Sequence, residues 1–317
     1  MRMTNGIYVS LEELVGLRIL ARDCKLRKAK SGRATHDGQY RSSRRGRGME
    51  FADVRQYQAG DDVRNIDWKI TARTQSTYTK LFEEEKERPV VLLVDQRSPM
   101  FFGSKLQFKS VLATKLAGLI SWSAFQNKDR IGALIFSDRE QADLRPKHGK
   151  HSVLHCLNKL TEFNQRLTTP LSYPQSSNGD SDNTLASMLV ELRRVCKPGS
   201  LVYLISDFHD LDEQCKKHLA LLARHNDLVF FSISDPLEKQ LPKNVDFKIT
   251  DGLQETSINT TSAAVGDTYT RLYNEHEYEV ASTATSLRAR YHALSTDSQF
   301  ASLAPILFSP RAQRRAL

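Results

Sequence analysis

Short apolar runs recur along the middle of the chain, and they predict buried β-strands. The first extends from Val90 to Val94, and comparable runs lie at 130–136, 201–205 and 228–233. Short continuous runs are typical of strands covered on both faces, as in a parallel sheet. Helical spacing of apolar residues fills each interval between them, which predicts right-handed crossovers. We therefore predict an α/β fold with a mostly parallel, Rossmann-like sheet flanked by helices, and with the Val90–Val94 strand at its centre.

The helices expected between these strands place their apolar residues on one face. They are expected at 104–125, 150–163, 184–196 and 211–225, and the first opens on a capping-box pattern at Ser104 and Gln107. Two more helices are expected nearer the ends of the chain, at 8–26 and 267–294. In the second of these, apolar residues seven positions apart suit either a coiled-coil seam or packing against the sheet.

Shifts in pattern divide the chain into four segments. Residues 1–48 combine a helix with a basic stretch, and residues 89–236 hold the α/β domain. Between them, residues 49–88 form an appendage in which alternating apolar residues predict strands. Residues 237–317 add a hairpin around Asp251-Gly252 and then the long helix.

The positive charge of the chain is concentrated in one segment. The net charge is +9, and residues 22–47 alone hold ten Arg and Lys against two Asp, a balance of +8. A nucleic-acid backbone or another anionic partner would suit this segment, and a solvated linker is the alternative. Apolar runs are too short for a membrane span, the N-terminus lacks a signal-peptide core, and the four cysteines form no CxxC pair. We expect a cytoplasmic protein.

The appendage interleaves aspartates with arginines. Gly60 and the two aspartates that follow it form a turn signal. The alternation of opposite charges permits a network of charge-assisted hydrogen bonds, which could simply hold the appendage onto the main domain or could take part in function. The residues of this signature are Arg55, Tyr57, Gly60, Asp61, Asp62, Arg64, Asp67, Trp68 and Arg73.

The same signature, followed by an acidic stretch and a strand that ends in Asp95, resembles the bacterial family called domain of unknown function fifty-eight. The resemblance is detailed from about residue 46 to 102 and looser to 311. It implies a von Willebrand factor A-like fold and an association with MoxR-type AAA+ ATPases. It implies no established catalytic activity.

The resemblance also implies a place for a metal ion. Von Willebrand A-like domains usually carry a metal-ion-dependent adhesion site, with Asp-x-Ser-x-Ser after the first strand and a later Thr and Asp. Here the first motif reads Asp95-Gln96-Arg97-Ser98-Pro99, whereas Thr184 and Asp207 fit the later positions. Two hypotheses follow. Either Arg97 replaces the cation and pairs with Asp95 and Asp207, or a weak Mg²⁺ site is rebuilt around Ser98 with Asp95, Thr184 and Asp207 as ligands.

Common catalytic and nucleotide-binding motifs are absent from the sequence. We therefore expect a non-enzymatic protein-binding or adaptor module that needs no cofactor, with a MoxR-type ATPase as its first candidate partner. Nucleic-acid or anionic-partner binding through residues 22–47 is the alternative, and a metal-dependent enzyme using Asp95 and Asp207 is a third hypothesis. The predicted partner-binding rim consists of Asp95, Arg97, Ser98, Thr184 and Asp207.

Overall fold

The computed structural model describes residues 6–22, 24, 49–84, 88–167, 183–242, 245–250, 255–260 and 263–302. The chain divides into two units. Residues 30–87 form the small unit, and all other residues form the large one. The helix near the N-terminus and the elements after residue 237, which the sequence set apart as segments of their own, thus belong to the large unit.

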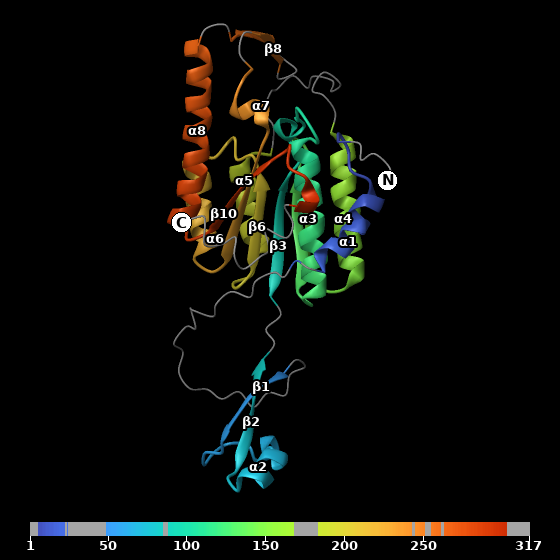
Figure 1. Ribbon diagram of the computed structural model, residues 1–317, viewed down its shortest axis with the longest axis vertical. Helices are drawn as coiled ribbons and strands as arrows, with labels where there is room; N and C mark the ends of the chain where they lie inside the picture. Colours follow the sequence, from blue (N-terminus) through green and yellow to red (C-terminus); the bar gives the residue numbers. More distant parts are fainter. Residues whose placement is uncertain are drawn as a thin grey trace. The chain divides into compact units, whose positions relative to one another are not determined.

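A six-stranded sheet in the order β10–β7–β6–β3–β4–β5 forms the large unit (Figure 1). β3 lies inside the sheet, between β6 and β4 and parallel to both. β7 and β10 continue the parallel arrangement, and β5 pairs antiparallel with β4 at the edge. The predicted mostly parallel sheet is therefore confirmed. The strands are β3 (Pro89–Asp95), β4 (Arg130–Phe136), β5 (Gln141–Lys147), β6 (Leu201–Ser206), β7 (Asp227–Ser234) and β10 (Arg290–Ser295).

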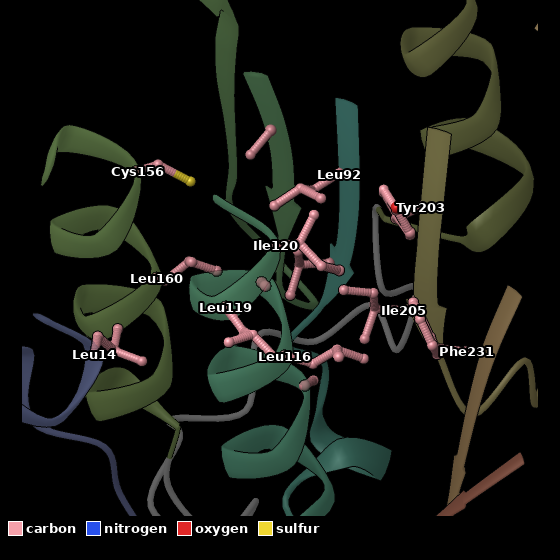
Figure 2. Close-up of a cluster of buried hydrophobic side chains, with 14 of the residues drawn as sticks. Leu14, Leu92, Leu116, Leu119, Ile120, Cys156, Leu160, Tyr203, Ile205 and Phe231 are labelled. Atoms are coloured by element: carbon pink, nitrogen blue, oxygen red, sulfur yellow. The ribbon is translucent and has the colours of Figure 1, made fainter. Parts of the chain in front are cut away.

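Helices cover both faces of this sheet, so its strands are buried as their apolar runs predict. One face carries α3 (Lys109–Gln126) and α4 (Lys150–Arg166), with α1 (Leu11–Ala21) packed on them. In Figure 2, Leu116 and Ile120 of α3 point toward the strands that carry Leu92 and Ile205. The other face carries α5 (Leu185–Val195), α6 (Glu213–Ala223) and α8 (Ala263–Ser286).

Several predicted helix boundaries are wrong. The helix expected at 8–26 spans Leu11–Ala21, and the one expected from 267 begins at Ala263. A long-range contact explains each of two further differences. The helix after β3 was expected to begin at Ser104. The backbone and hydroxyl of Ser104 both donate to Asp235 instead, so α3 begins only at Lys109. The long helix was expected to reach 294, but it ends at Ser286 because the following residues pair with β7 as β10. Buried residues of α8 pack on the sheet side, which decides against a coiled-coil seam.

The small unit is a strand pair with a helical insertion. β1 (Met49–Gln56) pairs antiparallel with β2 (Tyr78–Glu84), as expected for a β-rich appendage. The 3₁₀ helix η1 (Val63–Asn65) and the helix α2 (Trp68–Thr74) lie between them in the sequence. The expected hairpin after residue 245 is β8 (Asp246–Thr250) with β9 (Glu255–Asn259), and it follows the short helix α7 (Pro236–Lys239).

Two further features bear on the class of protein. The four cysteines, Cys24, Cys156, Cys196 and Cys215, form no disulfide with one another. Among the helices that the structure describes, none combines the length and the apolar character needed to cross a bilayer.

Candidate functional site

The parallel strands β3, β4, β6 and β7 all end at one edge of the sheet, and an aspartate ends or closely follows each of them. Ligands of open α/β sheets bind at this carboxyl edge. The aspartates are Asp95 at the end of β3, Asp138 after β4, Asp207 and Asp210 after β6, and Asp235 after β7. We call these five side chains, with Glu238 of α7, the acidic edge.

Arg97 is held between two carboxylates of the acidic edge. Its Nε and Nη2 donate to Asp95 at 3.0 and 2.7 Å, and its Nη1 and Nη2 donate to Asp210 at 2.6 and 2.8 Å. Asp95 is fully buried and Arg97 is 8% exposed. The guanidinium carbon also lies 5.1 Å from the ring centre of Phe136. Two bidentate pairs and a ring contact fix the orientation of this side chain.

The sequence predicted one of these two partners. The pair between Arg97 and Asp95 is present, but Asp210 takes the place expected for Asp207. The backbone explains the exchange. Phe208 has a positive φ of 56°, and the turn that it makes after β6 is followed by Asp210, whose carboxylate also accepts from the backbone of Leu185 at 2.8 Å. Asp210 thus joins the arginine to the start of α5.

Asp207 has a different cation, Lys109, which the sequence analysis missed. Lys109 is the first residue of α3 and is 2% exposed. Its Nζ donates to Asp207 at 2.9 Å and to Glu238 at 2.6 Å. A signal existed in the sequence. Lys109 lies three residues before Leu112, on the predicted apolar face of the helix, where a lysine must find buried partners.

Burial and charge pairing shift the pKa values of these groups in opposite directions. Burial raises the pKa of Asp207, but Lys109, the backbone N–H of His209 and Arg97 together lower it below its usual value. For Asp210, burial likewise raises the pKa, and the hydrogen bonds from Arg97 bring it below the usual value. Burial lowers the pKa of Lys109, yet Asp207 and Glu238 more than compensate and raise it. All three groups are therefore charged at neutral pH.

The two hydroxyl residues of the predicted rim serve other purposes. The backbone and hydroxyl of Ser98 donate to Asp138 at 2.9 and 2.6 Å, at the start of the 3₁₀ helix η2 (Ser98–Met100). Thr184 caps α5, because its hydroxyl accepts from the backbone of Ser187 at 3.2 Å. The structure thus brings Asp95, Arg97 and Asp207 to one edge but uses the expected hydroxyl ligands for local structure.

This donor set does not fit a divalent cation. Both oxygens of Asp95 already accept hydrogen bonds, from Arg97 and from the Ser206 hydroxyl at 2.7 Å. A metal at Asp95 would also lie beside the guanidinium charge. Within the described ranges, no group of three His, Cys, Asp or Glu is placed to hold a metal ion. The geometry favours the hypothesis that Arg97 stands where a cation would.

The residues of the small unit's signature include one ion pair, one turn and two helix caps. Arg55 pairs with Asp61 at 2.7 Å, next to the turn at Gly60, which has a φ of +105°. Asp62 caps η1, and Asp67 caps α2 by accepting from two backbone N–H groups. The remaining members are Tyr57, whose backbone pairs with Thr77, and the exposed residues Arg64, Arg73 and Trp68. The signature thus shapes the insertion between β1 and β2.

The predicted anionic-partner segment, residues 22–47, lies outside the described residues except for Arg22 and Cys24.

Comparisons with known proteins place the chain among proteins without an assigned role. A family model described as "Protein of unknown function DUF58" matches residues 53–279. Uncharacterized proteins of Mycobacterium tuberculosis and Mycobacterium bovis are each 28% identical over 277 residues, covering 85% of this chain and 81% of their own.

Two solved structures show a distant likeness. The conserved hypothetical protein BatB of Bacteroides thetaiotaomicron is 11% identical, with 69% of this chain and 95% of its own covered and a TM-score of 0.40. The manganese-loaded TRAP protein of Plasmodium vivax is 17% identical, with 46% and 56% covered and a TM-score of 0.33. Values at this level say nothing about activity.

Proposed function

Because the chain belongs to the DUF58 family of proteins of unknown function, we propose a function for it from its own acidic edge. The protein is a non-enzymatic binding module that presents this edge to a protein partner. The observation that carries the proposal is the pair of buried cations, Arg97 and Lys109, each held between two carboxylates.

These contacts suit recognition better than catalysis. A general acid or base works best with a pKa near the operating pH. Pairing moves the pKa of Lys109 up and those of Asp207 and Asp210 down, away from neutrality in each case. Burial raises the pKa of Asp95, but this carboxylate is fully buried behind Arg97 and Ser206, where no substrate reaches it. The side chains are also fixed by hydrogen bonds, which gives a partner a preorganised surface.

The charge of the edge indicates a basic partner surface. Its six carboxylates and two buried cations leave a balance of −4. The side chains of Asp210 and Glu238 are 33% and 30% exposed, so part of this charge faces solvent. Complementary charge directs association and sets specificity. The family resemblance makes a MoxR-type AAA+ ATPase the first candidate, and the role would then be that of an adaptor.

The binding experiment uses the full chain and the MoxR-type ATPase of the same cell. Interferometry measures the affinity of the wild type, Asp210→Asn and Glu238→Gln, which remove exposed charge with little change in shape. The matched control is Glu191→Gln, because Glu191 pairs with Arg194 on α5 and is 34% exposed. We expect the edge variants to bind about tenfold more weakly and the control to bind as the wild type does. Absence of binding, or an equal loss in the control, would reject this partner or this edge.

The proposal also holds that binding needs no metal. Calorimetric titration with Mg²⁺ or Mn²⁺ should show no micromolar binding, since Arg97 occupies the position beside Asp95. Micromolar binding by the wild type that disappears in Asp95→Ala would show the opposite and would favour a metal site.

A further inference from the structure

The edge of the sheet opposite the acidic edge is strongly basic. The amino ends of the parallel strands meet there, and β5 returns to the same edge because it runs antiparallel to β4. We call the segments at this edge the amino edge. They are residues 88, 127–130, 147–150, 197–200, 224–227 and 287–290. These segments hold nine Arg and Lys against two Asp, a balance of +7.

Arg88 contacts both aspartates of the amino edge and holds its loops together. Its backbone N–H donates to Asp129 at 3.2 Å, and its guanidinium pairs with Asp227. Its Nε also donates to the carbonyl oxygen of Gly199 at 3.2 Å, which joins the loop before β6 to the others. Six further cations of this edge are exposed, and within the described part of the chain none of them forms an ion pair. They are Lys128, Lys147, Lys150, Lys197, Arg224 and Arg288.

Helix electrostatics accounts for only part of this charge. Four of the six exposed cations follow the C-terminal ends of α3, α5, α6 and α8, where a positive charge stabilises the helix macrodipole. Lys147 and Lys150 have no such reason to be basic. Lys150 is the first residue of α4, at the positive end of that helix, where the dipole disfavours a cation. The positive charge therefore exceeds what the helix ends need.

The composition of the amino edge identifies the chemistry of its partner. Among the residues that the structure describes there, no large apolar or aromatic side chain is exposed. A protein interface needs an apolar core, and attachment to a membrane needs apolar side chains that enter the lipid. A single-stranded nucleic acid would need aromatic side chains on which its bases stack. A nucleic-acid duplex, in contrast, is bound through its phosphates by cations alone.

The size of the edge also suits a duplex. Six strands about 4.8 Å apart make an edge roughly 24 Å long, and a duplex carries one negative charge per about 1.7 Å of its axis. We propose that the amino edge binds a nucleic-acid duplex through its phosphates, without reading its sequence. This site lies at the opposite ends of the strands from the acidic edge and is independent of the function proposed for that edge.

The test is fluorescence anisotropy of a labelled DNA duplex of about 20 base pairs with the full chain, at salt concentrations from about 50 to 200 mM. Lys150→Gln/Lys197→Gln removes two exposed positive charges from the amino edge. We expect this variant to bind about tenfold more weakly at the lowest salt. The slope of log affinity against log salt should also become shallower by about two. An RNA duplex of the same length shows whether both kinds of duplex are bound.

The matched control is Lys105→Gln/Lys239→Gln, which makes the same change in net charge with two exposed lysines outside the amino edge. It should bind as the wild type does. The basic segment 22–47 is intact in every protein compared, so a difference between the variants comes from the amino edge. Circular dichroism shows whether each variant is folded.

Three results would overturn the proposal. They are absence of salt-dependent binding by the wild type, equal weakening in both double variants, and unchanged affinity and slope in Lys150→Gln/Lys197→Gln. Sedimentation velocity adds a further check. Self-association that this variant loses, without duplex binding by the wild type, would assign the amino edge to an acidic protein surface instead.

Discussion

Arg97 stabilises the carboxyl edge because it neutralises a carboxylate that water cannot reach. Asp95 is fully buried, and its other partner is the neutral hydroxyl of Ser206. Arg97→Met keeps the aliphatic volume but leaves a buried negative charge, so we expect a loss of about 3–5 kcal/mol in the free energy of unfolding. Urea unfolding followed by circular dichroism measures it.

Asp95→Asn in the Arg97→Met background is the informative companion. Because the amide carries no charge, the double variant should be more stable than Arg97→Met alone, and the double-mutant cycle should show strong coupling. Additive losses would mean that the two side chains act independently, which would contradict the pairing seen at 2.7 Å.

Some of these contacts could be predicted from the sequence and others could not, and the reason is physical. Asp95 and Arg97 lie two positions apart after a recognisable strand, so their pairing follows from local geometry. Asp210 is brought to Arg97 by the left-handed turn at Phe208. Lys109 meets Asp207 because α3 packs beside the end of β6. Contacts that depend on two distant segments leave weak traces in a single sequence.

At the scale of elements, the pattern of apolar residues predicted the type and order of the helices and strands better than it predicted where each begins and ends. β3 and β6 are buried along nearly their whole length, so their apolar runs mark them clearly. The start of α3 and the end of α8 are set by Asp235 and by the pairing of β10 with β7. A capping pattern such as that at Ser104 gives way when a buried carboxylate competes for the same donors.

Gly132 of β4 gives a prediction at this scale. A Cβ at this position would lie 2.6 Å from the carbonyl oxygen of Leu144 and 2.8 Å from the backbone nitrogen of Pro146, at the irregularity where β4 pairs with β5. Gly132→Ala should therefore destabilise the protein by about 1–3 kcal/mol, since strand backbone must move. Thermal unfolding measures the change.

Gly266→Ala is the matched control for this substitution. A Cβ on this residue of α8 would meet nothing within 4 Å, so alanine there should be neutral or stabilising by up to about 1 kcal/mol. Equal effects of the two substitutions would show that the close approach of β5 to Gly132 does not determine stability.

For the whole molecule, the distribution of charge matters more than the total. The chain is +9, yet the acidic edge and its two cations balance at −4 while residues 22–47 carry +8. A single net charge would predict one kind of partner. The segregation instead allows two kinds of partner, a basic protein surface at the acidic edge and an anionic partner at the basic segment.

The pH dependence of stability is also a property of the whole chain, and it falls into two pH ranges. Burial lowers the pKa of His292, with a further contribution from Arg290, to about 4. Its ring stacks on Phe231 at 5.2 Å between centroids. As pH falls below about 6.5, the unfolded state takes up this proton first, so stability decreases until the pH reaches about 4. The slope from this one group is at most about 1.4 kcal/mol per pH unit.

The carboxylates determine how stability changes in the lower pH range, below about 4. Because the pKa values of Asp207, Asp210 and Asp235 are lowered in the folded state, their stabilisation is complete above the unfolded value near 4 and is lost as pH falls through the folded values. Urea midpoints from pH 8 to 3 separate the two effects. His292→Phe keeps a ring against Phe231 but removes the proton site, so the loss between pH 6.5 and 4 should flatten while the loss below pH 4 persists. An unchanged slope in the upper pH range would mean that other groups carry it.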